Sequence, residues 1–148
     1  MEDRTFILRP ATMDDARLLH AWRNDSETRK ASRNSDPVSW REHEAWLSAA
    51  IASPDRLIRI VWDAHKPVGV VRADRSPEGW ELSWTVAPEA RGRGIGQRML
   101  RQFAAGFDGR LTAIIRKDNI ASAKIAVAAG FVCAGPADVR DFDSWVRS

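Results

Sequence analysis

The sequence predicts a sandwich-like α+β domain, and three features of the chain support this class. Several segments alternate polar and apolar residues, as Gly79–Ala87 does, which is typical of half-buried strands. Helix-capping residues precede amphipathic runs, and turn residues separate the segments. A chain of 148 residues can bury a substantial core, so we expect residues 1–148 to form a single domain. The predicted order of elements is β-α-α-β-β-β-α-β-α-β-β.

The first half of the chain is predicted to contain one strand, two helices and a long loop. Thr12 is placed to cap the first helix, and Asp15 lies three residues later as a capping-box partner. Ser39 and Glu42 form a fuller capping box for the second helix. In order, we expect a strand at Thr5–Arg9, a helix at Met13–Arg23, a loop at Asn24–Pro37 and a helix that ends near Ala52. A polar loop of that length is often functional or mobile.

The second half of the chain is predicted to be richer in strands. Asp118 or Asn119 is placed to cap its last helix, and Gly130 is placed to end that helix. In order, we expect strands at Arg56–Trp62, Val68–Asp74 and Trp80–Ala87, a helix that ends near Ala105, a strand at Leu111–Ile115, a helix at Ile120–Ala129, and strands at Phe131–Ala134 and Phe142–Val146.

The composition is that of a globular protein, and it favours a cytoplasmic location. No apolar run is long enough to span a bilayer, and the start of the chain, Met1-Glu-Asp-Arg, is too polar for a signal peptide. The single cysteine, Cys133, cannot form an internal disulfide, which fits a reducing compartment. Because Cys133 lies in an apolar segment, we expect a buried structural thiol and not a nucleophile.

The charge distribution suits an anionic ligand. The net charge of +3 arises from 23 basic and 20 acidic residues that are spread along the chain. A nucleic-acid-binding protein usually concentrates its basic residues on one face. We therefore expect no nucleic acid, no membrane and no metal among the partners, and we expect a monomer or a homodimer.

The segment Ala90–Leu100 carries the clearest functional signal. Three glycines, Gly92, Gly94 and Gly96, alternate with arginines and an isoleucine directly before an amphipathic run. Glycine lets a ligand approach the backbone closely, and a turn into a helix N-terminus aims unpaired N–H groups at one point. Such an arrangement binds anions, most often phosphate. The spacing excludes the dinucleotide fingerprint, and no Gly-Lys-Ser/Thr sequence follows as in a P-loop.

Two blocks of the sequence, taken together, carry a family resemblance. One is Arg91-Gly92-Arg93-Gly94-Ile95-Gly96, which follows Val86-Ala87-Pro88-Glu89. The other is Asn119–Phe131, with a serine three residues after the asparagine and Gly-Phe after the helix. These blocks resemble the cofactor loop and the later motif of the GNAT superfamily of acetyl-CoA-dependent N-acetyltransferases. They lie at the separation that the family shows, and the resemblance covers the whole chain.

The resemblance implies a fold and a cofactor. The fold would be a central mixed, mostly antiparallel sheet of six to seven strands flanked by about four helices, and the cofactor would be acetyl-CoA. Backbone amides of Gly92–Gln97 would hold the pyrophosphate, while the edge of Trp84–Val86 would bind the pantetheine arm as an added strand and polarise the thioester carbonyl. Asn119 would contact the pantetheine arm and also cap its helix. The implied cofactor-binding residues are Trp84, Thr85, Val86, Arg91, Gly92, Arg93, Gly94, Ile95, Gly96, Gln97, Asn119 and Ser122.

The implied reaction is direct attack of a primary amine on the acetyl group, without a tyrosine as general acid. Many members of the family place a tyrosine seven residues after the motif asparagine to protonate the leaving sulfur. This chain has Ala126 at that position and no tyrosine anywhere, so the sequence excludes that mechanism. Ser122 is the nearest hydroxyl candidate for this step, although a serine in the first turn of a helix is common for local reasons.

Two side chains are candidates for the general base. Glu81 is preferred, because it shares a strand face with Ser83 and Thr85 beside the expected acetyl site. The alternative for Glu81 is an exposed strand carboxylate. His43 is the other candidate, since in this family its helix borders the acceptor pocket. The alternative for His43 is a packing residue.

The acceptor is indicated only by a diffuse similarity in the first half of the chain. Trp22-Arg23-Asn24-Asp25 and His43-Glu44-Ala45-Trp46 resemble GNAT members of nonulosonate pathways of the pseudaminic acid type, which acetylate the 4-amino group of a UDP-linked amino sugar. Tryptophan stacks on sugars or nucleobases, and arginine binds diphosphate. The alternative is that these tryptophans are core residues of two packed helices. The implied substrate-binding residues are Trp22, Arg23, Asn24, His43 and Trp46.

Two further functions stay open on the sequence. One is a protein N-terminal α-amine acetyltransferase of the ribosomal-protein type, which also favours a serine three residues after the motif asparagine. The other is a non-catalytic acyl-CoA-binding domain, because neither of the family's usual catalytic side chains is assured.

Overall fold

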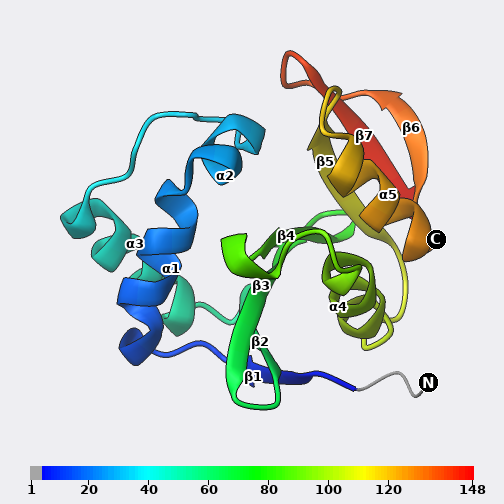
Figure 1. The fold of residues 1–148 in the computed structure, drawn as a ribbon. Helices are drawn as coiled ribbons and strands as arrows, with labels where there is room; N and C mark the ends of the chain where they lie inside the picture. The colour runs from blue at the N-terminus through cyan, green and yellow to red at the C-terminus, as the bar shows by residue number, and fades with distance from the viewer. Residues whose placement is uncertain (1–4) are drawn as a thin grey trace.

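The structure of the protein, a computed structural model, describes residues 5–148, and its centre is one seven-stranded sheet (Figure 1). The strands are β1 (Ile7–Pro10), β2 (Arg56–Asp63), β3 (Lys66–Ser76), β4 (Gly79–Val86), β5 (Leu111–Arg116), β6 (Val132–Pro136) and β7 (Phe142–Arg147). Their order across the sheet is β1-β2-β3-β4-β5-β7-β6, and every neighbouring pair except β4 with β5 is antiparallel. The predicted class, an α+β fold with a mixed, mostly antiparallel sheet, is confirmed.

The helices form two groups, which lie on opposite sides of β3 and β4 in Figure 1. The first group contains the 3₁₀ turn η1 (Met13–Asp15), α1 (Ala16–Asn24), α2 (Ser26–Ala31) and α3 (Trp40–Ala52). The second contains the 3₁₀ turn η2 (Pro88–Ala90), α4 (Ile95–Ala104) and α5 (Ile120–Ala128). Helix α3 packs against β2, α4 packs against β3, and α4 contacts α5.

The predicted helix caps are present. Thr12 and Asp15 form a complete capping box, although the turn that follows them is a 3₁₀ helix and α1 begins only at Ala16. The Ser39 hydroxyl caps α3 by accepting a hydrogen bond from the Glu42 amide at 3.2 Å, but the Glu42 carboxylate accepts from the Ser39 hydroxyl at 2.9 Å, so this box is less complete than the one predicted.

The expectation of a loop throughout Asn24–Pro37 is wrong, because α2 occupies Ser26–Ala31. Asp25 caps this helix by accepting a hydrogen bond from the Thr28 amide at 3.1 Å. Helix α2 has no buried residue, so its sequence has no apolar periodicity from which a helix could be predicted.

The sheet divides between β4 and β5. These parallel strands pair only at Trp80 with Leu111 and at Glu81 with Thr112. Beyond this point β4 continues to Val86 and β5 continues to Arg116 without pairing to each other. The two halves of the sheet therefore diverge, as Figure 1 shows, and the second half of β4 has a backbone edge that no strand within residues 5–148 covers.

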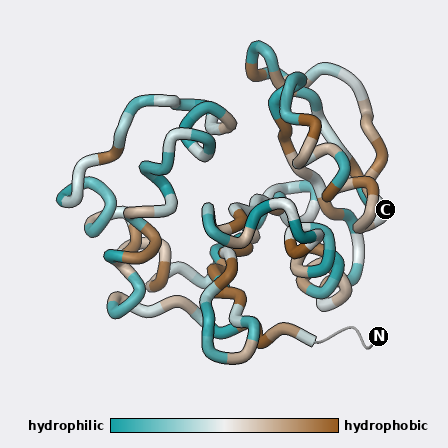
Figure 2. Tube along the Cα trace, in the orientation of Figure 1, coloured by the Kyte–Doolittle hydropathy of each residue, from teal (hydrophilic) through white to brown (hydrophobic). Residues whose placement is uncertain are grey.

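The core lies between the sheet and the two helix groups. In Figure 2 the apolar segments gather on the central strands and on α4. A Cβ atom on Gly69 would lie 2.8 Å from the Thr85 carbonyl oxygen and 2.7 Å from the Met99 sulfur, so glycine allows α4 to approach β3 closely. The largest fully buried side chains are Phe131, Leu47, Ile60, Leu82, Met99, Leu100, Leu111, Val61 and Val71.

The prediction for Cys133 is wrong, because its thiol is free and exposed. Cys133 lies on β6, the last strand of the sheet, and the neighbouring Val132 and Ala134 are exposed as well. The apolar composition of this segment led us to expect burial, but at the edge of the sheet these side chains are not covered by another described element. Within residues 5–148, no helix is both long enough and apolar enough to cross a bilayer.

Candidate functional site

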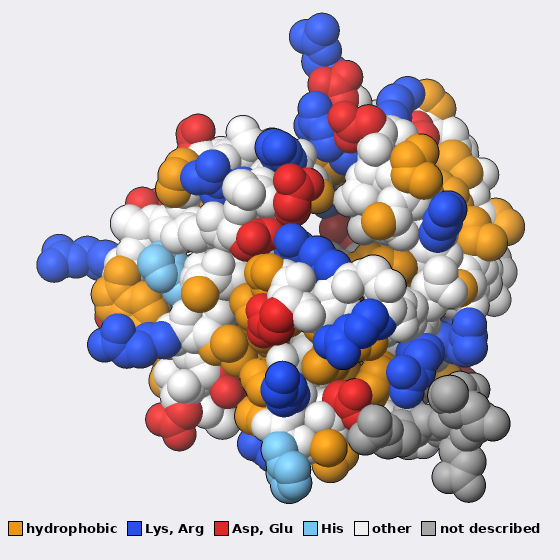
Figure 3. Space-filling model, in the orientation of Figure 1, with side chains coloured by type: hydrophobic (Ala, Val, Ile, Leu, Met, Phe, Trp, Pro, Cys, Tyr) orange, Lys and Arg blue, Asp and Glu red, His pale blue; other side chains and the backbone are white. Residues whose placement is uncertain are grey.

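A cleft of about 1600 Å³ opens where β4 and β5 diverge. One side of this cleft is formed by the second half of β4, the glycine loop and the first turns of α4 and α5, and we call it the donor side, a name that, like that of the opposite side, refers to the role implied by the sequence resemblance. The other side, which we call the acceptor side, is formed by α1, α2, α3 and the polar face of β3 and β4. Side chains of both charges surround the hollow in the centre of the face shown in Figure 3.

Two glycines of the loop adopt a backbone conformation that other residues rarely adopt. Gly92 and Gly94 have φ angles of 79° and 72°, in the left-handed region that favours glycine. Gly96 is required for a different reason, because a Cβ atom there would lie 2.4 Å from the Ile125 side chain and 3.0 Å from that of Val86. The loop is therefore held in shape by backbone conformation and by close packing of α4 on α5 and β4.

The first turn of α4 has free hydrogen-bond donors. Its N-cap, Gly94, has no side chain to cap the helix, and the first helical bond is donated by the Arg98 amide to the Gly94 carbonyl oxygen. Among the described residues, no acceptor is found for the amides of Ile95, Gly96 and Gln97. These three N–H groups lie at the positive end of the helix dipole and border the cleft.

The first turn of α5, which follows β5 in the chain, is also part of the donor side. Asn119 caps this helix, because its side-chain oxygen accepts a hydrogen bond from the Ser122 amide at 3.0 Å. Both residues line the cleft. Ala126, which stands where the family often has a tyrosine, is fully buried and contributes no polar group.

The second half of β4 completes the donor side. Trp84, Thr85 and Val86 pair with β3 on one edge and line the cleft. The Trp84 indole N–H is buried and has no hydrogen-bond partner in the described part of the chain. Because an unpaired buried donor is costly, this group is suited to a ligand that brings an acceptor into the cleft.

A buried histidine lies on the acceptor side. His43 is 4% exposed and lines the cleft, and its Nδ1 atom has no partner among the described residues. Its ring centroid lies 5.3 Å from that of His20 and 5.8 Å from that of Trp46. Burial lowers the pKa of His43, and the charges of His20 and Arg23 lower it further. The imidazole is therefore held in its neutral form, which can accept a proton.

The carboxylate of Glu81 is paired. Its Oε2 atom accepts a hydrogen bond from Arg33 at 2.9 Å. On the neighbouring strand Asp74 lies directly opposite Glu81, and Arg72 binds Asp74 at 2.6 Å. Each of the two adjacent carboxylates is thus neutralised by its own arginine, which offsets the repulsion between them.

The predicted acceptor residues of α1 have three different environments. Trp22 is 4% exposed, so most of its ring belongs to the core even though it borders the cleft. Arg23 donates to the Asn34 carbonyl oxygen at 2.9 Å, while its Nη1 atom is buried without a partner among residues 5–148. Asn24 holds Val38 by two hydrogen bonds, of 2.7 and 2.8 Å, and does not line the cleft.

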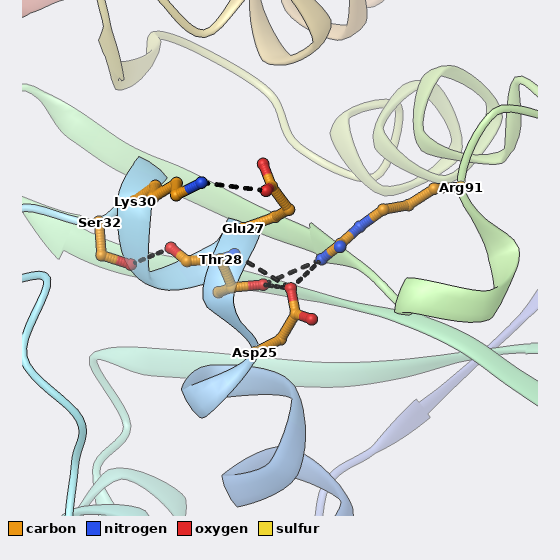
Figure 4. Close-up of polar contacts among 6 residues, drawn as sticks. All are labelled: Asp25, Glu27, Thr28, Lys30, Ser32 and Arg91. Carbon is orange, nitrogen blue, oxygen red and sulfur yellow. Dashed lines mark hydrogen bonds and ion pairs between the residues drawn. The ribbon is translucent and has the colours of Figure 1, made fainter.

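The two arginines of the glycine loop point in different directions. Arg91 donates to Asp25 at 2.8 Å and to Thr28 at 3.1 Å, and so reaches α2 on the acceptor side (Figure 4). Arg93 donates to the Glu89 carbonyl oxygen at 3.4 Å and does not line the cleft. With the exceptions of Asn24 and Arg93, every residue predicted for the site borders this one cleft.

Comparison with known proteins identifies the family. Residues 5–132 match the model of the acetyltransferase (GNAT) domain. This match covers most of the chain, and the chain belongs to that family. It is a GNAT acetyltransferase. Acetyl-CoA is the acetyl donor of this family.

Solved structures agree with this fold. An acetyltransferase from Thermus thermophilus is 26% identical, with a TM-score of 0.82 and coverage of 99% of both chains. A spermidine N-acetyltransferase from Vibrio cholerae in complex with CoA and spermine is 18% identical, with a TM-score of 0.82 and coverage of 95% of this chain and 94% of that one. AAC(6')-Ib in complex with ribostamycin and coenzyme A is 16% identical, also with a TM-score of 0.82, and the match covers 98% and 94% of the two chains. The sequence matches none of the curated proteins.

Sequence reasoning missed several residues of the acetyltransferase's cleft. Arg33 and Arg72 line the cleft and bind Glu81 on β4 and Asp74 on β3, respectively, while Asp25, which lies outside the lining of the cleft, binds Arg91 of the glycine loop. Arg72 also lies over the Trp46 ring, with its guanidinium carbon 5.1 Å from the ring centroid. The only available signal was the polarity of the segments that contain these arginines, since nothing local in the sequence identifies their partners.

Proposed function

We propose that this GNAT acetyltransferase transfers an acetyl group from acetyl-CoA to a primary amine on an anionic molecule, with His43 as the general base. The acceptor that we favour is a nucleotide-linked amino sugar. We further propose that residues 1–148 act as one catalytic domain, since both sides of the cleft come from this chain.

The donor side fits coenzyme A. The free amides of Ile95, Gly96 and Gln97 at the N-terminus of α4 offer several N–H groups to the pyrophosphate. The uncovered edge of β4 can bind the pantetheine arm as an added strand. The Asn119 side-chain oxygen is used as the helix cap, and its N–H₂ group, which has no acceptor among the described residues, can bind the same arm.

The chemistry follows from the need for a neutral amine. When bound, acetyl-CoA supplies a thioester carbonyl, to whose carbon the amine nitrogen bonds as the carbon–sulfur bond breaks. We assign the polarisation of that carbonyl to a backbone amide at the end of β4. His43 accepts the proton that the attacking amine loses. The thiolate gains a proton from water or from Ser122, because no tyrosine is available.

His43 is favoured over Glu81 by their partners. The Glu81 carboxylate is bound to Arg33 at 2.9 Å, whereas His43 Nδ1 has no partner among the described residues and its lowered pKa keeps the ring neutral. A neutral imidazole on a residue that borders the cleft, without a charged partner among the described residues, is the better proton acceptor at neutral pH.

The anionic character of the acceptor rests on Arg23. No carboxylate among the described residues pairs with this guanidinium, and burial lowers its pKa, as does the nearby charge of Arg29. An arginine that borders the cleft and has no carboxylate partner among the described residues favours a phosphate or carboxylate on the acceptor.

The experiment is a panel of amines assayed for acetyl-CoA turnover. Release of the coenzyme A thiol would be measured in a Cys133→Ser background, because the exposed Cys133 would react with the detection reagent. The panel contains a UDP-linked 4-amino sugar, the same amino sugar without the nucleotide, a peptide with an acidic N-terminus, and spermidine.

We expect the highest kcat/KM for the UDP-linked sugar, and a loss of about tenfold or more without the diphosphate. Preference for the peptide would retain the anionic acceptor but replace the sugar by a protein N-terminus. Preference for spermidine would contradict the anionic acceptor. Binding of acetyl-CoA without turnover of any amine would contradict the enzyme assignment and favour an acyl-CoA-binding domain.

A further inference from the structure

Helix α2 is held over the cleft by polar contacts and not by burial. None of its six residues is buried, and yet Thr28, Lys30 and Ala31 border the cleft. An element without a buried side chain gains little from the hydrophobic effect, so its position depends on the groups that tie it to the rest of the molecule.

One set of hydrogen bonds joins α2 to the glycine loop. The Arg91 guanidinium donates to the Asp25 carboxylate at 2.8 Å and to the Thr28 hydroxyl at 3.1 Å, as Figure 4 shows. The same Asp25 oxygen accepts from the Thr28 amide at 3.1 Å and from the Thr28 hydroxyl at 3.3 Å. One carboxylate oxygen therefore serves as both the N-cap of α2 and the partner of Arg91.

This tie is specific and partly shielded from water. The Asp25 side chain is 20% exposed, and that of Arg91 is 34% exposed. Burial alone would raise the pKa of Asp25, but the hydrogen bonds from Arg91 and Thr28 outweigh it, and the pKa lies below its ordinary value. The carboxylate is therefore ionised throughout the neutral range, and the pair is intact there.

Arg91 directly precedes Gly92 in the chain, so its side chain extends from the backbone of the glycine loop that leads into α4. A pyrophosphate bound to the amides of α4 would restrict this backbone, and with it the position from which the Arg91 side chain extends. Because that side chain ends on α2, the restriction reaches the acceptor side across the cleft.

We infer that Arg91 and Asp25 are positioning residues, which couple the binding of coenzyme A at the glycine loop to the placement of α2 on the acceptor side. Coenzyme A, once bound, thereby orders one wall of the acceptor site, and the donor favours binding of the acceptor. This inference rests on the proposed donor site, and the experiment below separates the two.

The experiment measures amide hydrogen exchange of the full chain with and without coenzyme A. In the wild type we expect saturating coenzyme A to slow exchange in residues 92–97 and also in residues 26–31, the latter by roughly threefold to tenfold. Arg91→Gln keeps the Asp25 cap, and we expect it to abolish the effect in residues 26–31 while the loop is still protected.

Two further variants make the test specific. Arg93→Gln makes the same charge change two residues away, but Arg93 does not reach α2, so coupling should persist at saturating coenzyme A. Asp25→Asn retains an N-cap acceptor while it removes the charge, so it should weaken coupling without unfolding α2. If Arg91→Gln does not fold, Asp25→Asn decides the question alone.

The outcomes are distinguishable. Absence of any protection, together with no binding heat in calorimetry, would mean that the donor site itself is wrong. Protection of residues 92–97 without a change in 26–31, or equal protection of 26–31 in wild type, Arg91→Gln and Asp25→Asn, would overturn the coupling and leave the donor site in place.

Discussion

The donor and acceptor sides of the cleft are built from different chemical groups. The donor side is mainly backbone: left-handed glycines, the free amides of the first turn of α4 and the uncovered edge of β4. The acceptor side is made of side chains held by ion pairs and ring contacts between elements distant in the chain, such as Arg33 with Glu81 and His43 with His20. A site made of backbone groups keeps its binding groups when most side chains are substituted. A site made of side chains loses a binding group with each substitution, so the two sides should respond differently to mutation.

The largest effect is expected from changing the backbone of the donor side. In Gly94→Val a β-branched residue must adopt a φ near 72°, and we expect the KM for acetyl-CoA to rise about 100-fold because the loop is displaced. The measurement is the initial rate at varied acetyl-CoA. Gly109→Val is a matched control, since Gly109 has a φ of 84° and open space around it but does not line the cleft. Equal effects of both variants on the KM for acetyl-CoA would contradict the donor role of the loop.

The next effect is on the acceptor side and concerns proton transfer. We expect His43→Asn to lower kcat by about 100-fold and to leave the KM for acetyl-CoA unchanged. In the wild type, activity should fall as the pH drops below the ordinary value of 6.5 and through the lowered pKa of His43, and the variant should lack this dependence. The exposed His65 provides the control His65→Asn, which should behave as wild type. A larger loss in Glu81→Gln than in His43→Asn would transfer the role of base to Glu81.

A smaller effect is expected for binding of the acceptor. Arg23→Gln should raise the KM for an anionic acceptor about tenfold, and the KM for acetyl-CoA should not change, because Arg23 lies on the acceptor side only. Arg41→Gln removes one exposed charge from α3 outside the cleft and is the control for net charge. A similar rise in KM for neutral and anionic amines would show that Arg23 does not recognise the anion.

The smallest effect concerns stability. Because the pKa of His43 is lower in the folded than in the unfolded chain, the unfolded chain binds more protons just below pH 6.5. The contribution of His43 to the free energy of unfolding should therefore be fully present above pH 6.5 and should be lost as the pH falls through the lowered pKa of the folded state. His43 faces His20 on α1, Trp46 on its own helix and the Arg23 charge. Because other groups also titrate, the contribution of His43 is measured as the difference in unfolding free energy between wild type and His43→Asn, from urea titrations at several pH values. An identical pH dependence in both proteins would contradict the lowered pKa.

The same contrast explains what the sequence could predict. Capping residues, strand periodicity and the glycine spacing are local signals, and they correctly predicted the fold class and most of the helices and strands. The partners of Glu81 and Arg91 lie 48 and 66 residues away in the chain, and no local pattern reports such distances. Helix α2 was missed because it buries nothing, and Cys133 was misplaced because an apolar strand gives no indication that it lies at the sheet edge.

The short pairing of β4 with β5 has a consequence for the lifetime of the protein. Only two residue pairs join the halves of the sheet at this point, so a molecule bound in the gap would supply contacts that the polypeptide does not make for itself. A ligand that binds only the folded chain raises the free energy of unfolding in proportion to the logarithm of its concentration. We therefore expect the melting temperature to rise with coenzyme A, so that resistance to heat and proteases follows the supply of acetyl-CoA.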